Sequence, residues 1–489
     1  MLVVGFLSTL ALTGCNSPIY YYSENNYAGR ATPPSGLQQR VLATFTTNGS
    51  AGGAEILDGL RDIRSNVQNT VTSFTISGYS GQYPSFIFNF PEQEAGYILD
   101  NNTGALAAIN YAKESSTGSV AAFGASPGGV GASPDGTRFV GATASTGQLI
   151  ITTGSGTYAL SVPNINGVVL NPGNTIILAT SRNANSLYRV VQLPQTSTPV
   201  TPPGSIDCEP LLLPVYCVVP VPGTYDRPIG AYFSFDGSLA YILDAGPEQG
   251  GTTAGITALN TSALLTSVIP TVNPLSTGAP SPMATLPVTN PIAIPGGVTA
   301  AVSDGVNLYL SGQSMYRLAS TGYLGTTPAT DGLFTGFMTV LNQTSYVPAK
   351  PISISDGTHT RMLLADNSTL WIGSSQCANG ERAATSQDDN CLTMVSLVPT
   401  VPVATVIPNL TPGGTTTVAY PNSNGNEYYY GNLTGLCWVQ TFNKVYTAYG
   451  GQIHVFSTVD GSEIDNTNVT IQGTVLDVAY MDALTNAAN

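Results

Sequence analysis

Residues 230–244 read GAYFSFDGSLAYILD, and this stretch decides the fold. A run of aromatic and small residues precedes Asp236 and Gly237, and a second apolar run from Ala240 to Leu243 follows them. An Asp-Gly pair between two such runs is among the strongest short-range signals for a β-hairpin. The stretch therefore predicts two antiparallel strands joined by a tight turn.

Weaker copies of this pattern recur along the whole chain, and we distinguish two kinds of strand. The first kind is an apolar run that ends in a polar turn: 40–44, 96–100, 138–142, 176–180, 240–244, 308–311, 370–373 and 444–448. The second kind follows after a loop and alternates apolar with polar residues: 55–58, 107–110, 149–152, 188–191, 256–260, 338–342, 393–396 and 453–456. Repeats of this kind are typical of a ring of small antiparallel sheets. We expect an all-β chain folded as a β-propeller of eight four-stranded blades, or of seven if one unit is an embellishment.

The two ends of the chain complement each other. The first repeat begins at Arg40 without a preceding inner strand, whereas the last residues supply an unassigned strand over 474–480. Pairing the C-terminal strand with the N-terminal blade closes the ring and leaves only short, protected sheet edges.

Composition excludes some partners. Charged residues make up 9% of the chain, well below the ~25% usual in soluble proteins, and the net charge is −14 with three lysines, Lys113, Lys350 and Lys444. So few cations cannot neutralise a phosphate backbone, and an anionic membrane surface would repel the chain. We therefore expect no nucleic-acid partner.

The N-terminal residues resemble a targeting signal. The apolar run Leu2 to Leu12 is too short to span a membrane, and it ends in Leu12-Thr13-Gly14-Cys15, which resembles a bacterial lipobox. The resemblance implies cleavage before Cys15 and acylation of that residue, which anchors the protein in a membrane. No Lys or Arg precedes the run, and a chance match in an ordinary apolar segment is the alternative.

The anchor defines the expected domains and localisation. Residues 1–14 form a lipoprotein signal peptide, 15–35 a flexible tether and 36–489 the propeller. Asn16 follows the cysteine, which by resemblance to enterobacterial sorting favours the outer membrane. We expect an extracytoplasmic protein, on the periplasmic side or at the cell surface.

Five further cysteines fit an oxidising compartment. Cys208 lies near Cys217 and Cys377 near Cys391, and each pair encloses a loop-like segment, so we expect two local disulfides. Cys437 stands within an apolar stretch and is expected to be a buried small hydrophobe. The spacings do not suggest zinc.

The turns and strands together resemble a known repeat family. Turns similar to Ser/Asn-Pro-Asp-Gly occur at 133–136, 235–237, 303–305 and 355–357. With the two kinds of strand, they resemble the YVTN/lactonase-like β-propeller repeat family over about residues 36 to 489. Blade seven departs most, through an insertion from Gln376 to Asn390. The family includes lactonases, quinoprotein-like enzymes and binding modules, so the resemblance implies the fold and leaves the activity open.

Signatures of catalysis are sparse. The histidines, His359 and His454, lie about two blades apart and read as surface or strand residues. We find no nucleophile elbow and no phosphate-binding loop that opens a helix. The sequence predicts no catalytic residue, no metal and no cofactor, with a cation site at Asp388 and Asp389 as the alternative.

The loops between the two kinds of strand all emerge on one face of the ring, where a rigid scaffold presents them. Their candidate ligand-binding residues are Asp100, Asn101, Arg182, Asn183, Asn185, Asp244, Glu248, Arg382, Asp388 and Asp389. Such side chains suit hydroxyl-rich ligands such as glycans, but Asn, Asp and Gly are also good turn residues. Asp100 and Asp244 could each bond backbone amides within their own turn.

Three hypotheses follow. The first is an envelope lipoprotein whose propeller is a binding or scaffolding platform for a protein or a polysaccharide. The second is an envelope hydrolase or lactonase-like enzyme with a site at the mouth of the central channel. The third is a protein that assembles into a surface array.

Overall fold

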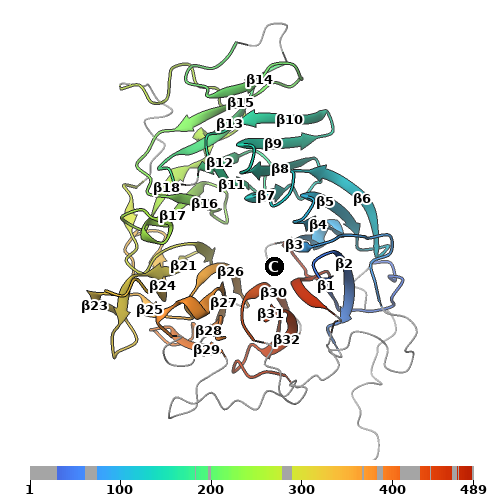
Figure 1. The fold of residues 1–489 in the computed structure, drawn as a ribbon, viewed down its shortest axis with the longest axis vertical. Coiled ribbons are helices and arrows are strands. Elements are labelled where there is room, and N and C mark those ends of the chain that lie inside the picture. Colours follow the sequence, from blue (N-terminus) through green and yellow to red (C-terminus); the bar gives the residue numbers. More distant parts are fainter. Residues whose placement is uncertain are drawn as a thin grey trace, which may run out of the picture.

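The structure is a computed structural model of the 489-residue chain. It describes residues 30–60, 74–181, 183–195, 200–277, 289–365, 368–382, 389–407, 430–440, 442–464, 471 and 473–486. These residues form strands and short 3-10 helices arranged as a ring of eight blades (Figure 1). The described helices are all too short or too polar to cross a bilayer. The predicted all-β propeller with eight blades is confirmed.

Each of the first four blades is an antiparallel sheet. Blade 1 contains β33 (Thr474–Tyr480), β1 (Arg40–Thr47) and β2 (Ala51–Asp58). Blade 2 contains β3 (Pro84–Phe90), β4 (Ala95–Asp100), β5 (Ala105–Asn110) and β6 (Ser115–Ala122). Blade 3 contains β7 (Gly129–Ala132), β8 (Arg138–Thr143), β9 (Gln148–Thr153) and β10 (Gly156–Ser161). Blade 4 contains β11 (Ile165–Leu170), β12 (Ile177–Ser181), β13 (Leu187–Gln192), β15 (Tyr216–Val221) and β14 (Asp207–Glu209).

The other four blades complete the ring. Blade 5 contains β16 (Pro228–Phe233), β17 (Leu239–Asp244), β18 (Gly255–Asn260) and β19 (Ile292–Ala293). Blade 6 contains β20 (Ala300–Ser303), β21 (Asn307–Ser314), β24 (Thr335–Asn342) and β25 (Ile352–Ser353), with an inserted hairpin of β22 (Tyr316–Leu318) and β23 (Leu324–Pro328). Blade 7 contains β26 (Thr358–Leu364), β27 (Thr369–Ser375), β28 (Leu392–Ser396) and β29 (Val403–Ile407). Blade 8 contains β30 (Leu433–Val439), β31 (Lys444–Tyr449) and β32 (Gln452–Ser457).

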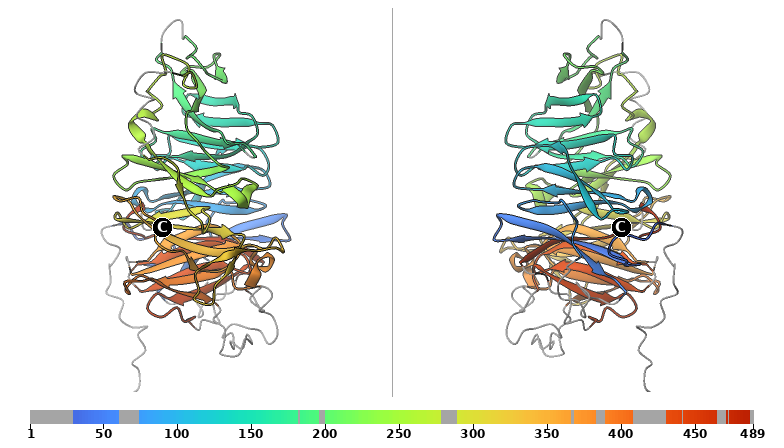
Figure 2. Two further views of the ribbon diagram at one scale, coloured as in Figure 1. Left: turned by 90° about the vertical axis from the view of Figure 1, so that its left-hand side faces the viewer. Right: turned by 90° about the vertical axis from the view of Figure 1, so that its right-hand side faces the viewer.

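The short helices lie in the connections between strands. They are η2 (Pro91–Gln93), η3 (Gly246–Gln249), η4 (Thr261–Ala263) and η6 (Cys377–Asn379). In Figure 1 the labelled strands nearest the centre of the ring are β3, β7, β11, β16, β26 and β30. The two side views show the sheets one above another along the long axis of the molecule (Figure 2). Apolar residues from facing sheets pack between the blades, as in the cluster that joins blade 8 to blade 1.

The hairpin predicted over residues 230–244 forms as β16 and β17. In the turn, Gly237 adopts a φ of 70°, a left-handed conformation that glycine adopts without a steric cost. The Asp236 carboxylate accepts a hydrogen bond from the Ser238 amide at 3.0 Å. The Asp-Gly pair therefore acts as the turn former that the sequence indicates.

The ring closes as predicted. β33 pairs with β1 in antiparallel register, with Val41 opposite Tyr480. Just beyond this pairing the buried Arg40 donates to Asp482 at 2.7 Å and to Glu114 of blade 2 at 3.0 Å. One guanidinium thus joins the two ends of the chain to the next blade.

Both expected disulfides are present, and Cys437 is free and buried. Burial raises the pKa of the Cys437 thiol well above its ordinary value. The Cys208–Cys217 bond differs from the expected loop staple because both cysteines lie on strands. They stand opposite each other on β14 and β15, so the bond holds a fifth strand on the outer edge of blade 4.

Candidate functional site

The predicted loop residues are distributed over four blades. Asp100 ends β4 and Asn101 follows it, and Asp244 ends β17 and Glu248 follows it. Asn183 and Asn185 lie between β12 and β13, and Arg382 and Asp389 lie between β27 and β28. Arg182, Asp388 and Cys15 lie outside the described residues. The structure links Glu248 to Arg382 through neighbouring groups, whereas the described hydrogen bonds do not connect Asp100 or Asn101 to them.

Asp100 is a structural residue of its turn. One carboxylate oxygen accepts hydrogen bonds from the amides of Gln82 and Tyr83, and the other accepts from the amide of Thr103 at 3.0 Å. Burial alone would raise the pKa of Asp100, but these bonds outweigh burial and hold the pKa below its ordinary value. Of the two interpretations of this residue, the structure favours backbone bonding over ligand binding.

Asp244 occupies the corresponding place in blade 5 but has a different environment. The side chain is buried, and its Oδ1 atom has no hydrogen-bond partner among the described residues. Burial raises its pKa to about 7; the amide of Asp226 opposes this rise and the carboxylate of Asp226 adds to it. A buried carboxyl of this kind is poorly placed to bind a ligand from solvent.

The remaining loop residues are mostly exposed turn positions. Asn183 is exposed with a φ of 56°, and Asn185 accepts a hydrogen bond from the Arg227 amide at 3.2 Å. The exposed Asp389 uses its backbone oxygen to accept from the Tyr449 hydroxyl. The cation site at Asp388 and Asp389 stays a prediction, because Asp388 lies outside the described residues.

A chain of polar contacts crosses blades 5, 6 and 7. Glu248 of η3 accepts a hydrogen bond from the side-chain amide of Gln313 at 3.0 Å, and Gln313 in turn accepts from the Gly357 amide at 3.0 Å. Next to Gly357, the buried Asp356 accepts from the Arg382 amide at 2.6 Å. Burial raises the pKa of both Glu248 and Asp356. These contacts fix the loops of three blades relative to one another.

Arg382, a member of this network, also lines a groove between blades 6 and 7. Its Nε donates to the Ile354 oxygen at 2.9 Å, and its Nη2 donates to the Ser353 hydroxyl. The groove has a volume of about 550 Å³. It is bounded by the β22–β23 hairpin with Tyr323, by β25, and by six consecutive residues, 401–406, at and before β29. Because successive residues of a strand point to opposite faces, the groove runs along the edge of β29.

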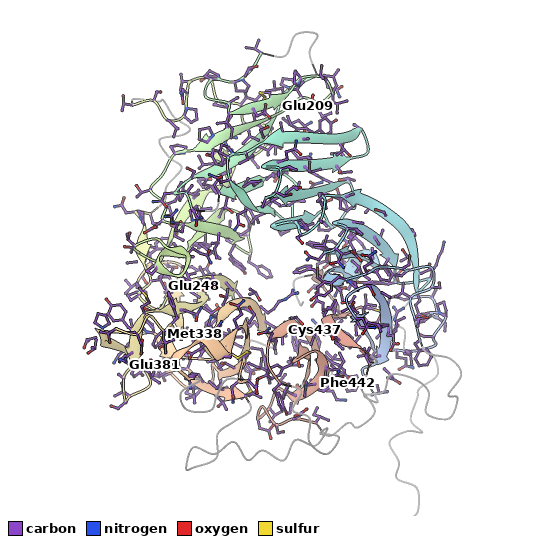
Figure 3. The ribbon with its side chains drawn as sticks, viewed as in Figure 1. Glu209, Glu248, Met338, Glu381, Cys437 and Phe442 are labelled. Atoms are coloured by element: carbon purple, nitrogen blue, oxygen red, sulfur yellow. A yellow bond between two sulfur atoms is a disulfide. The ribbon has the colours of Figure 1, made fainter. Side chains whose placement is uncertain are left out.

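One carboxylate holds the hairpin wall of this groove in place. Glu381 accepts hydrogen bonds from Thr335 Oγ1 at 2.6 Å and from the Leu318 amide at 3.3 Å, and it pairs with Arg317 at 3.1 Å. Figure 3 shows Glu248 and Glu381 on the side of the ring that blades 5 to 7 form. The groove is thus a built feature with two anchored walls.

A second polar feature lies where inner strands meet. Arg361 of β26 donates to the Thr434 oxygen of blade 8 at 2.9 Å and to Asp477 of blade 1 at 3.1 Å. Its guanidinium carbon lies 4.3 Å from the ring centroid of Phe86 in blade 2. Burial raises the pKa of Asp477, and the charge of Arg361 opposes that rise. Arg361 therefore touches three blades besides its own.

The histidines are core residues. His359 lies in β26 and not in the turn before it, its Nε2 is 2.9 Å from the Ser355 oxygen, and burial lowers its pKa to about 4. His454 lies 2.7 Å from Glu463 and stacks on Tyr430. The interpretation as strand residues is correct, but neither is at the surface. Within the described ranges no group of three metal-ligating side chains converges.

Sequence reasoning missed Gln313, Asp356 and the groove. Asp356 was visible only as part of an Asp-Gly turn, and Gln313 lies at the end of a strand without a motif. Their contacts join residues 20 to 65 positions apart in the chain, and no local pattern signals them.

No family model matches this chain, and no curated protein matches its sequence. Among solved structures, dihydro-heme d1 dehydrogenase NirN in complex with DHE is similar with a TM-score of 0.51 and 11% identity, over 92% of this chain and 76% of that one. The periplasmic gluconolactonase PpgL of Pseudomonas aeruginosa has a TM-score of 0.41 and 14% identity, over 90% and 98%. The Cps50 (Swd1) β-propeller domain of Myceliophteria thermophila has a TM-score of 0.42 and 8% identity, over 80% and 99%. At such identities the likeness concerns the fold alone.

Proposed function

We propose that this chain is a lipid-anchored protein of the bacterial cell envelope whose propeller is a rigid platform that binds a partner protein. The observation that supports the binding role is the groove between blades 6 and 7, whose walls are fixed by Glu381 and by the Glu248–Arg382 network. Rigid walls favour affinity because little conformational entropy is lost on binding. The anchor rests on the lipobox at Cys15 and on the oxidising compartment that the disulfides indicate.

The lining of the groove favours a protein over a polysaccharide. Val401 and Val403 on one wall are each 54% exposed, and Leu318 on the other is 37% exposed. Exposed aliphatic side chains beside a strand edge gain free energy by covering apolar surface, which a polypeptide supplies. A sugar needs aromatic platforms, and Tyr323 already has the Lys350 ammonium 4.0 Å from its ring centroid.

Site-specific photocrosslinking tests this role. A photoreactive amino acid at Val403 is expected to capture one envelope protein in cells. The same amino acid at Val459, an exposed valine of blade 8, serves as the matched control and is expected to capture none. The captured protein, once purified, must then bind the propeller, and Ser353→Trp, which fills the groove, must weaken that binding. Equal capture at both valines, or tight binding to the filled groove, contradicts the proposal.

The anchor has an independent test. Labelling with a lipid precursor is expected to mark the wild-type protein and not Cys15→Ala, and the variant is expected to leave the membrane fraction. A membrane-bound, unlabelled wild-type protein would refute lipidation while leaving the groove proposal intact.

An enzyme at the channel is the second candidate function, and Arg361 is the observation that favours it. Its side chain is 20% exposed, and its Nη1 atom makes no hydrogen bond among the described residues. Such a cation could hold the carboxylate of a substrate. Hydrolysis of sugar lactones that falls in Arg361→Gln would support the enzyme. Sedimentation of the delipidated protein distinguishes both functions from self-assembly into an array.

A further inference from the structure

The outer edges of the blades are protected in different ways, and β29 is the exception. Exposed strand edges invite pairing with other chains, and proteins blunt them with bulges, short strands or covering segments. The edge of β6 is irregular, because its pairing with β5 carries two register shifts. The edge of β10 has a partner in β14, because the Asp207 carboxylate of β14 accepts a hydrogen bond from the Ser161 amide of β10 at 2.6 Å. The outer strands β19 and β25 have two residues each.

β29 has none of these protections among the described residues. It pairs with β28 over five residues in a regular register without a bulge. The backbone of Val403 to Val406 makes no described hydrogen bond on the other side. The groove lies along this edge, so there is space next to the backbone of β29 for another segment.

Blade 4 shows that this propeller accepts a fifth strand. β14 adds to the outer strand β15 in antiparallel register, with Asp207 opposite Val218 and Glu209 opposite Tyr216. The geometry of strand addition is thus already present in the molecule. In blade 4 the added strand belongs to the chain, whereas in blade 7 none of the described residues occupies this position.

The charged side chains around the groove indicate what kind of segment would bind in it. Lys350 is exposed, has no ion pair among the described residues and lies over Tyr323 of the groove wall. Arg382 lies at the floor, where the Asp356 carboxylate is 3.8 Å from its Nε atom and balances its charge. The exposed Lys350 ammonium beside the groove, on a protein of net charge −14, favours a segment that carries a carboxylate. A second copy that paired β29 with β29 would offer the sequence VATVI, which has no carboxylate to face Lys350, and this disfavours a dimer.

We propose that an extended, acidic segment of the partner protein adds to β29 as a fifth strand of blade 7. Its backbone hydrogen-bonds to the free edge, its apolar residues cover Val401 and Val403, and its carboxylate faces Lys350. Main-chain hydrogen bonds supply affinity in this mode, and side-chain pockets supply specificity. This inference rests on the proposed function, since it names the chemistry of the partner for the same groove.

The experiment uses the mature protein and a synthetic seven-residue peptide that alternates threonine and valine around one glutamate. We expect binding by fluorescence polarisation and protection of the β29 amides from hydrogen exchange. N-methylation of alternate peptide amides is expected to weaken binding roughly tenfold or more, because it removes edge hydrogen bonds. Lys350→Glu is expected to weaken binding of the peptide that carries glutamate. It is expected to strengthen binding of a second peptide in which lysine replaces that glutamate.

Each contrary result is informative. A peptide that does not bind, or that leaves β29 exchange unchanged, overturns strand addition. If photocrosslinking from Val403 still captures a partner, the binding role stands and strand addition alone falls. If the N-methylated peptide binds as tightly as the unmodified one, the groove recognises the side chains of the peptide without pairing to its backbone, which contradicts strand addition. Concentration-dependent protection of β29 without peptide would mean that a second copy is the occupant.

Discussion

Blades 2 and 5 carry the same sequence, Tyr-Ile-Leu-Asp, at the end of their second strand, yet the two aspartates have opposite pKa shifts. Asp100 lies opposite Pro84 and Asp244 opposite Pro228, and both pairings contain a register shift at the next position. The strands are therefore equivalent in sequence, register and irregularity. The pKa of Asp100 lies below its ordinary value, whereas that of Asp244 rises to about 7.

The difference comes from the donors that surround each carboxylate. In blade 2, the amide of Tyr83 donates to Asp100, whereas the equivalent amide of Arg227 donates to Asn185. Three positions after each aspartate, blade 2 has Thr103, which donates to Asp100. Blade 5 has Pro247 at that position, and proline has no amide proton.

Neighbouring charge increases the contrast. The Asp226 carboxylate is occupied by the amides of Thr252 and Thr253, and its negative charge raises the pKa of Asp244 further. In blade 2 the equivalent residue is Gln82, whose amide donates to Asp100 as that of Asp226 does to Asp244, but whose side chain carries no charge. A turn aspartate is thus stabilising only when the adjacent loops direct amides toward it.

Among the destabilising changes, the largest expected effect is the loss of Asp100. Asp100→Asn replaces one acceptor oxygen with an NH₂ group that must face backbone donors, and it removes the charge that strengthens the remaining bonds. We expect a loss of roughly 2–4 kcal/mol in the free energy of unfolding at pH 7. Urea unfolding measures it. A loss below that of Asn102→Ala, an exposed neighbour in the same loop, would contradict the role of these amides.

The same substitution in blade 5 should act in the opposite direction. Below pH 4, Asp244 is protonated in the folded and the unfolded chain. Between pH 4 and 7 the unfolded chain ionises at its ordinary pKa while the folded chain keeps the proton, so wild-type stability falls. The Asp244→Asn variant has no carboxyl group at this position, so its free energy of unfolding does not fall for this reason. The pKa difference of about three units corresponds to about 4 kcal/mol, so we expect the variant to be more stable than the wild type by about that amount at pH 8 and nearly equal to it at pH 4.

Urea unfolding of both proteins at pH 4, 6 and 8 checks the prediction. A stability difference that does not change between pH 4 and 8 would mean that Asp244 has an ordinary pKa. Glu248 lies in the same connection, so hydrogen exchange of the loop after β17 shows whether the proton on Asp244 also affects the network of blades 5 to 7.

Much of the fold was readable from sequence, because it depends on local patterns. The alternation in residues 230–244, its copies and the unassigned strand near Val475 determine the blades and the closure. The spacing of the cysteines likewise predicts both disulfides. The site was less predictable. The contact between Glu248 and Gln313 joins residues 65 positions apart, and the groove forms only when the hairpin of blade 6 packs beside β29.

The contrast between Asp100 and Asp244 falls between these cases. The replacement of threonine by proline three positions later is visible in the sequence, but the diversion of the Arg227 amide to Asn185 depends on packing between blades 4 and 5. Residue type alone therefore identified both aspartates as candidates without separating a stabilising residue from a destabilising one.

The smallest expected effect tests whether one donor can convert blade 5 toward blade 2. Pro247→Thr restores the amide and the hydroxyl that Thr103 provides, so it should lower the pKa of Asp244 by about one unit or less, because charge-assisted bonds to a carboxylate favour its ionised form. Titration of the Asp244 carboxyl carbon by NMR measures the shift. Pro247→Val, which restores the amide alone, should give a smaller shift in the same direction. If both variants leave the pKa near 7, the missing donor is not the cause, and the charge of Asp226 together with burial must account for the difference between the two blades.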